Sequence, residues 1–363
     1  IVLDQKIKLI RERMVKEGIS MLVLCPGPHM AWLFDFYPLP DERPCFSCLS
    51  LNNLSFLVPS LNLEQFRSKL NYSFYTWQDE EGPNTAFMKL VSEMSLPEGS
   101  KIAVDETMRA DFLYLIQDTL PKAPITFSKS TVGYLRMLKT ECEYQKLKKS
   151  ALVADNSMKA ALESISPKIS ELEVSAIINQ AFHEQGARPA FSLVASGSNA
   201  AFPHHHSCQD TLEKGKPVII DIGGVFGEYF SDMTRMIHIG EPSDRYLFIH
   251  NVVEEALQAA LDKATIGTAA SEVDNAARKV IEIAGFGEYF VHRTGHGLGL
   301  EIHEPPYITS SSEIILEEGM VFTIEPGIYM PGDFGVRLEE VVYLSKNGPR
   351  ILSGLSRELF VID

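Results

Sequence analysis

Carboxylates interrupt apolar, strand-like runs in the second half of the chain. The segment Pro217–Phe226 carries Asp221 after Val-Ile-Ile, and the returning segment Tyr229–Ile239 carries Asp232. Glycines between the two segments favour a hairpin, which would place Asp221 and Asp232 on neighbouring strands. Two buried carboxylates at that distance repel, so one takes up a proton unless a cation lies between them. The alternative is that one Asp is a turn residue and the other faces solvent.

The same pattern recurs twice downstream. The segment Val321–Tyr329 contains Glu325 after an apolar stretch, and Val336–Leu344 contains Glu339 and Glu340. A single acid of this kind is usually the charge of an edge strand. Its repetition on three strand-like segments favours a shared task for these carboxylates.

Histidines are concentrated between these segments. His292, His296 and His303 lie close together, and glycines on both sides of His296 allow the backbone a close approach. The run lacks the strand–turn–helix context of a dinucleotide fingerprint, and no helical HExxH is present, which excludes a mononuclear zinc protease of that type. A further run, His204–His206, follows Pro203, and we expect its last two histidines, His205 and His206, at the surface.

Length and periodicity predict two domains in an α/β (α+β) chain. Helical and strand-like segments alternate over residues 1–125, which indicates an N-terminal α/β domain. Residues 126–140 are expected to be a linker, since prolines and a glycine loosen the pattern around them. Residues 141–363 combine pairs of amphipathic helices with antiparallel-looking strands and form the predicted second domain.

Charge and cysteine content narrow the possible partners. The chain has 33 Lys+Arg against 48 Asp+Glu and a net charge of -15, which argues against nucleic acid and anionic membranes. No apolar run approaches the ~18 residues of a membrane span, and the first residues do not resemble a secretory signal. Five scattered cysteines favour reduced thiols and a cytoplasmic protein. Cys45-x-x-Cys48 lacks a second ligand pair, so we interpret both as structural thiols.

Taken together, the motifs resemble the pita-bread metallopeptidases, the superfamily of methionine aminopeptidase, aminopeptidase P and prolidase. That family has two Asp separated by ten residues, a His within TGHGxG, a Glu within EPG and a Glu within RxE. All occur here in order, as Asp221, Asp232, His296, Glu325 and Glu339. The resemblance implies a C-terminal pita-bread catalytic domain and a smaller N-terminal creatinase/prolidase-like domain. The extra domain, with His292 and His303, points to the proline-specific branch.

The resemblance also implies a dinuclear metal site. Asp221 would bind one ion, Asp232 and Glu339 would bridge, and His296 and Glu325 would complete the other. Mn²⁺ or Co²⁺ is expected, with Zn²⁺ or Fe²⁺ as alternatives, because the ligands are mostly hard oxygens. A hydroxide bridging the two ions would be the nucleophile, and Glu325 the general base.

Further roles follow from the same resemblance. His204 and His303 would steady the developing oxyanion or contact the peptide, and His292 would shape the proline pocket. Arg337 would meet the carboxylate of a dipeptide or act as an ion-pair partner behind the ligands. Tyr329 would contact substrate or orient ligands, and Thr234 would orient ligands, although a packing role is open for both.

The expected activity is hydrolysis of the Xaa-Pro bond of a short proline-containing peptide by an Xaa-Pro dipeptidase. The alternatives are an aminopeptidase P acting on longer Xaa-Pro-Xaa peptides, a C–N hydrolase of the same fold and an inactive binding module. The resemblance also implies a homodimer. One departure bears on specificity, because Trp32–Phe36 replaces a Tyr-Leu-Thr-Gly-Phe-like stretch that can approach the partner's active site in related dimers.

Overall fold

The chain divides into two compact units, Ile1–Arg136 and Met137–Asp363, in the computed structural model, which describes residues 2–166 and 168–362. The division falls inside residues 126–140, where a linker was expected. This segment is nevertheless regular, since it holds most of strand β6 (Ile125–Phe127) and the helix α6 (Val132–Met137). Pro121 and Pro124 precede this segment, and Gly133 lies inside α6, so the helix continues through the glycine.

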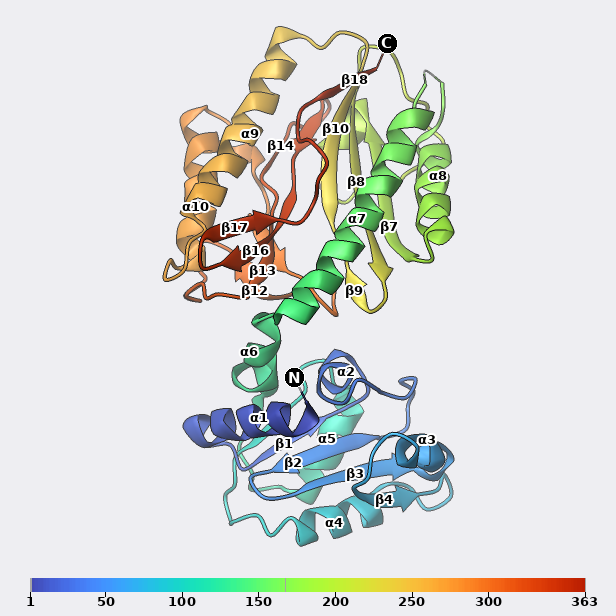
Figure 1. The fold of residues 1–363 in the computed structure, drawn as a ribbon, viewed down its shortest axis with the longest axis vertical. Coiled ribbons are helices and arrows are strands. Elements are labelled where there is room, and N and C mark those ends of the chain that lie inside the picture. The colour runs from blue at the N-terminus through green and yellow to red at the C-terminus, as the bar shows by residue number, and fades with distance from the viewer. Residues whose placement is uncertain (1, 167, 363) are drawn as a thin grey trace. The chain divides into compact units, whose positions relative to one another are not determined.

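The first unit is built on a mixed six-stranded sheet in the order β4-β3-β2-β1-β5-β6 (Figure 1). Strand β1 is antiparallel to β2 and parallel to β5. Besides β6, the strands of this sheet are β1 (Met21–Leu24), β2 (Phe46–Ser50), β3 (Leu54–Pro59), β4 (Ser73–Trp77) and β5 (Ile102–Val104). The helices of the unit are α1 (Leu3–Glu17), α2 (Pro28–Phe34), α3 (Leu63–Arg67), α4 (Asn84–Glu93) and α5 (Ala110–Thr119). Cys45 and Cys48 are buried free thiols in this unit, as their interpretation as structural residues requires.

The second unit contains two sheets and a separate hairpin. One sheet has the order β18-β10-β8-β7 with β9 attached to β8, and the other has the order β12-β11-β13-β16-β17. These strands, with the hairpin β14–β15, are β7 (Arg188–Ser196), β8 (Pro217–Phe226), β9 (Tyr229–Phe230), β10 (Met233–Ile239), β11 (Gly295–Gly297), β12 (Glu304–Ile308), β13 (Val321–Ile324), β14 (Gly327–Tyr329), β15 (Gly335–Arg337), β16 (Glu340–Ser345), β17 (Gly348–Ile351) and β18 (Phe360–Ile362).

Two helix pairs pack on these sheets (Figure 1). Helices α7 (Glu141–Ser164) and α8 (Glu171–Glu184) contact the first sheet, while α9 (Asp244–Lys263) and α10 (Ala270–Ile283) contact the strands of the second. Both α7 and α8 begin with a capping box, in which Thr140 or Ser170 exchanges hydrogen bonds with the Glu three residues later. Among the described residues, no helix is long and apolar enough to span a bilayer.

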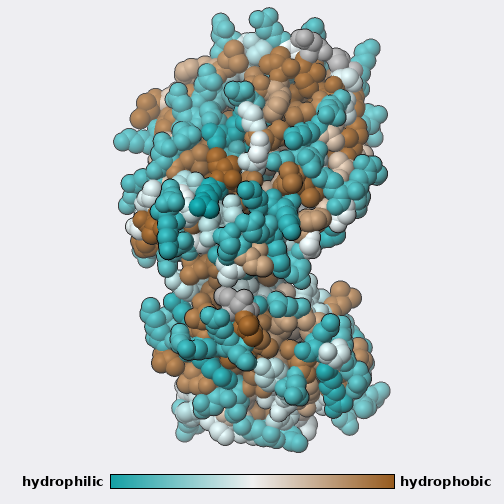
Figure 2. Space-filling model, viewed as in Figure 1, coloured by the Kyte–Doolittle hydropathy of each residue, from teal (hydrophilic) through white to brown (hydrophobic). Residues whose placement is uncertain are grey.

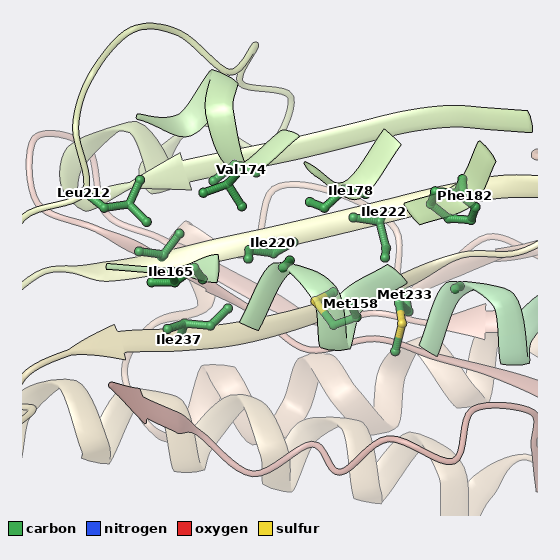
Figure 3. Packing of buried hydrophobic residues seen from close by; sticks show 14 of the residues in the cluster. Met158, Ile165, Val174, Ile178, Phe182, Leu212, Ile220, Ile222, Met233 and Ile237 are labelled. Carbon is green, nitrogen blue, oxygen red and sulfur yellow. The ribbon is translucent and has the colours of Figure 1, made fainter. Parts of the chain in front are cut away.

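The core between α7, α8 and the first sheet decides which way Asp221 faces (Figure 3). Ile220 and Ile222 of β8 belong to this core together with Met158 and Phe182 from the helices. Side chains alternate across a strand, so Asp221 must face the opposite side of the sheet. Burial of each such apolar side chain contributes about 1.5–3 kcal/mol, which holds β8 in this register.

Three segments expected to be strand-rich are each divided at the acid they contain. Asp232 lies between β9 and β10, Glu325 between β13 and β14, and Glu339 between β15 and β16. At the last two breaks the chain passes between the second sheet and the β14–β15 hairpin. The breaks free these carboxylates from the alternation of a continuous strand.

The surface shown in Figure 2 carries mostly hydrophilic side chains with hydrophobic ones scattered among them in both units. Exposed apolar residues in small groups are ordinary for a folded protein. The hydropathy of this face therefore does not single out a further functional surface.

Candidate metal centre

The five residues expected to bind metal line one cavity of about 780 Å³. Asp221 comes from β8 of the first sheet, Asp232 from the break between β9 and β10, and His296 from β11 of the second sheet. Glu325 and Glu339 reach the same cavity from the strand breaks. The other residues expected at the site that line this cavity are His204, His292, His303 and Arg337.

The ligand atoms of this group approach one another closely. Asp232, His296 and Glu339 each offer an atom within 4.8 Å of the others. Nε2 of His296 lies 3.2 Å from Oε1 of Glu325 and 3.5 Å from Oδ2 of Asp232. Nδ1 of the same ring lies 3.0 Å from the carbonyl oxygen of Gly297, and this contact orients the ring so that Nε2 faces the carboxylates.

Burial and mutual repulsion act together on the acids. Burial raises the pKa of Asp232 and of Glu339 well above the usual range, and the charges of neighbouring carboxylates add to the effect. Burial also raises the pKa of Asp221, although the charge of Arg337 opposes it. At Glu325 burial is outweighed by the hydrogen bond and the charge of His296, and the pKa falls to about 2.

This donor set fits divalent cations. Oδ1 of Asp221 is buried and has no hydrogen-bond partner within residues 2–166 and 168–362, so one acceptor at the centre is unused. Four carboxylates and one imidazole supply hard and borderline donors, which suit first-row divalent ions. Positive charge placed among these carboxylates would offset both their repulsion and the cost of burying them.

Arg337 and Tyr329 form a hydrogen-bonded chain beside the acids. Arg337 donates to Oδ2 of Asp221 at 2.8 Å, to the Tyr329 hydroxyl at 2.8 Å and to Oγ1 of Thr234 at 3.2 Å. The Tyr329 hydroxyl also lies 2.7 Å from Nε2 of His292. Burial raises the pKa of Tyr329 to about 12, so the hydroxyl keeps its proton at neutral pH.

The remaining histidines lie at the mouth of the cavity. The ring of His303 packs edge-to-face on His296 with 4.1 Å between centroids. Burial and then the charge of His296 lower the pKa of His303 to about 4, which makes it neutral at physiological pH. His204 is exposed and lines the same cavity.

Several residues that hold the centre together were missed in the sequence. Oγ1 of Thr323 accepts a hydrogen bond from the backbone N–H of His296 at 3.0 Å and donates to Glu325 at 2.9 Å. Arg235 is fully buried and donates to the carbonyl oxygen of Glu339 at 2.7 Å. A signal for Thr323 existed, because it is a polar residue in an apolar strand two positions before Glu325.

Comparison with known proteins identifies the families whose sequences match the two units. Residues 145–346 match the metallopeptidase family M24, and residues 6–138 match the creatinase/prolidase N-terminal domain. The chain belongs to metallopeptidase family M24. It is therefore a peptidase of the hydrolase class, and its family uses divalent metal ions.

Similar proteins cover both units. The chain is 33% identical over 364 residues to an Xaa-Pro dipeptidase of Pyrococcus horikoshii, with 99% of each chain covered. A solved prolidase of Thermococcus sibiricus superposes with a TM-score of 0.92 at 34% identity over 100% of both chains. An X-Pro aminopeptidase of Thermotoga maritima superposes with a TM-score of 0.80 at 29% identity, covering 97% of this chain and 100% of the other. The predicted family and α/β fold class are confirmed.

Proposed function

We propose that this M24 peptidase hydrolyses the Xaa-Pro bond of dipeptides with two divalent cations. The observation that carries the proposal is the convergence of Asp221, Asp232, His296, Glu325 and Glu339 on one cavity with His204, His292, His303 and Arg337. Relatives named Xaa-Pro dipeptidase and prolidase, similar over the whole chain, support the choice of substrate.

The five acidic and imidazole residues would hold the cations. When bound, a pair of such ions activates water as a nucleophile and polarises the scissile carbonyl. Mn²⁺ or Co²⁺ is our first choice, with Zn²⁺ or Fe²⁺ as alternatives, because oxygen donors dominate and metal availability selects among these ions. An Xaa-Pro bond has no N–H, so chemistry directed at the carbonyl suits this substrate.

Glu325 is the proposed general base. Its carboxylate lies among the other proposed ligands, 3.2 Å from Nε2 of His296, and would accept a proton from the attacking water and pass it to the leaving proline nitrogen. His303 is neutral at physiological pH and can donate a hydrogen bond to the developing oxyanion without adding a fixed charge. His204, exposed beside it, is the second candidate for this role.

Arg337 is best explained as a positioning residue. Its guanidinium is 3% exposed and already donates to Asp221, Tyr329 and Thr234, which leaves little of it for a substrate carboxylate. It therefore orients Asp221 toward the cations. His292 lines the cavity and would form a wall of the proline pocket, while Tyr329 lies behind it and holds the ring through its hydroxyl.

The test compares a dipeptide with a longer peptide. Purified enzyme is given Ala-Pro and Ala-Pro-Ala, each with chelator, with Mn²⁺ and with Co²⁺. Metal-dependent cleavage of Ala-Pro alone is expected. Cleavage of the tripeptide would favour the second candidate, an aminopeptidase P, which the similarity to the Thermotoga maritima enzyme supports. The absence of metal-dependent turnover of either peptide would refute both the dipeptidase and the aminopeptidase P proposals. An inactive binding module or another C–N hydrolase would then be the remaining alternatives.

We also propose a homodimer in the cytoplasm. All five cysteines are free thiols, which suits a reducing compartment. The dimer rests on the family resemblance, and sedimentation of the purified protein at the mass of two chains would support it.

A further inference from the structure

A second group of metal-binding side chains lies immediately after His204. Glu171 is the first residue of α8, and His205 and Cys208 follow His204 in the chain. Each offers one ligand atom, and the three atoms lie within 4.8 Å of one another. We infer that Glu171, His205 and Cys208, joined by Asp210, form a Zn²⁺ site beside the five-residue centre. It has its own ligands, although His205 also lines the cavity that contains that centre. This inference does not depend on the proposed substrate.

The distances are close to those that zinc requires. Sγ of Cys208 lies 3.4 Å and Nε2 of His205 lies 2.7 Å from the same oxygen, Oε2 of Glu171. Tetrahedral zinc, with bonds of about 2.0–2.3 Å, places its ligand atoms about 3.3–3.6 Å apart. The sulfur already meets this spacing, and the imidazole has to withdraw by roughly 0.6 Å, a movement that rotation of the ring supplies.

Glu171 is a rigid anchor for such a site. Its side chain is fully buried, and its other oxygen, Oε1, accepts hydrogen bonds from the backbone N–H of Ser196 at 2.8 Å and from Asn199 at 3.0 Å. These contacts fix the carboxylate. Its Oε2 accepts a hydrogen bond from the backbone N–H of Cys208 at 3.0 Å and also faces the His205 ring and the Cys208 thiol. A second layer of this kind orients ligands in metal sites.

Asp210 lies next to this group and would supply the fourth ligand by moving its exposed side chain, because only the other three already have ligand atoms within 4.8 Å of one another. Nδ2 of Asn199 donates to Oδ2 of Asp210 at 3.0 Å and lies 3.9 Å from Sγ of Cys208, so both groups surround the same amide. Hydrogen bonds from Asn199 and then from the Cys208 thiol lower the pKa of Asp210. Asp210 is exposed and Cys208 is half-buried, which gives an ion a path from solvent.

The ligand chemistry distinguishes this site from the first. Zn²⁺ replaces the thiol proton of Cys208, which is released to solvent, and Nε2 of His205 donates its lone pair while Nδ1 keeps the proton. Thiolate selects zinc over Mn²⁺, whereas the five-residue centre has no sulfur ligand. The competing explanation is a purely structural one, in which Glu171 only ties down the loop by hydrogen bonds.

Cadmium provides a readout that only a thiolate site gives. Cys25, Cys45 and Cys48 are buried, so a Cys142→Ser change leaves Cys208 as the accessible thiol. This variant, loaded with Mn²⁺, is titrated with Cd²⁺ while the ultraviolet sulfur-to-cadmium charge-transfer band is followed. We expect the band to saturate at one equivalent per chain and to disappear on addition of Zn²⁺.

Further variants separate a built site from a lone thiol. In the same background, Cys208→Ser should abolish the band, and His205→Asn or Asp210→Asn should weaken Cd²⁺ binding by at least about tenfold, the effect expected even of outer-layer partners. His206→Asn, at the exposed neighbouring position, is the matched control and should bind as before. Circular dichroism checks that each variant is folded.

Two results would overturn the site. One is the absence of a charge-transfer band at equimolar Cd²⁺. The other is a band whose affinity is unchanged in both His205→Asn and Asp210→Asn, which would show a thiol acting alone and leave the cluster with a structural role only.

Discussion

Glu325 receives two opposing effects on a single carboxyl group. Burial favours the neutral acid, while the imidazole of His296, 3.2 Å away, favours the carboxylate and wins. Thr323 donates a hydrogen bond to the same oxygen, Oε1, at 2.9 Å and further fixes the side chain. These contacts hold the carboxylate in a fixed orientation among the ligands, and a proton acceptor must be positioned in this way before its proton affinity matters.

We therefore predict that Glu325→Gln lowers kcat by about 10²–10⁴ while the fold is retained, because Gln keeps the shape but cannot accept the proton. The measurement is steady-state hydrolysis of Ala-Pro at saturating Mn²⁺, with metal content and circular dichroism recorded alongside. Glu313→Gln, at an exposed position of the same unit, is the control and should behave as wild type. Wild-type turnover by Glu325→Gln would refute the assignment of the base.

The contribution of Glu106 to the stability of the fold depends on pH. Burial opposes ionisation, but the contact with His29, 3.4 Å away, and the hydrogen bond from Ser128 lower the pKa of Glu106 from 4.5 to about 2. A lowered folded-state pKa stabilises the fold above about pH 4.5, and this contribution is lost as the pH falls toward 2.

Glu106→Gln should therefore lower the free energy of unfolding at about pH 6 by at most about 3 kcal/mol. The difference from wild type should shrink at about pH 2.5, where the carboxyl group is becoming protonated. Urea unfolding of both proteins at the two pH values measures it, with Glu80→Gln at an exposed position as the control. A difference that does not change with pH would contradict the linkage.

At the scale of elements, the site depends on strands that approach unusually closely. A Cβ on Gly295 would lie 1.9 Å from the carbonyl oxygen of Thr323, so β11 can sit beside β13 only with glycine at this position. That approach places His296 next to Glu325. The glycine that allows β11 to pack closely against β13 therefore also sets the distance between His296 and Glu325.

Gly295→Ala is expected to push β11 away from β13 and to cost about 1–3 kcal/mol of stability, together with a clear loss of metal affinity. Thermal unfolding and isothermal titration with Mn²⁺ measure the two effects. Gly354→Ala is the control, because its Cβ would meet only Oδ2 of Asp155 at an ordinary 3.5 Å. Unchanged Mn²⁺ affinity in Gly295→Ala would show that β11 does not set the position of His296.

At the scale of the whole molecule, the cations would also be part of the fold. Each cation that binds the folded state at 100 times its dissociation constant adds about 2.7 kcal/mol of stability, so two ions add about 5.4 kcal/mol. For a unit the size of Met137–Asp363 this corresponds to about 11 °C in Tm. Chelation should lower the Tm by about that amount and abolish activity, and Mn²⁺ should restore both.

Asp232→Asn is the diagnostic variant for this effect. Removing one of the crowded charges should raise the Tm of the metal-free protein and reduce the shift produced by Mn²⁺. Calorimetry of both proteins with and without metal measures it. Equal shifts in the two proteins would mean that the ions stabilise the chain elsewhere.

The sequence was informative where the deciding interactions are local. Glycines after Asp221 predicted the return of the chain beside β8, and the spacing of apolar residues predicted the amphipathic helices α7 and α8. The division of strands at Asp232, Glu325 and Glu339 was not predicted, because apolar periodicity continues through each break.

The amino-acid sequence by itself was enough to predict the five candidate ligands, four carboxylates and one imidazole, because the motifs that contain them are patterns of neighbouring positions. Tertiary structure alone decided that Arg337 holds Asp221, that Thr323 links His296 to Glu325, and that Glu171 faces His205 and Cys208. We had expected His205 at the surface, yet its ring bonds to a buried carboxylate 34 residues away in the chain. Such partners meet only when separate strands and helices pack together. The periodicity of apolar residues within one segment does not predict which segments pack against each other.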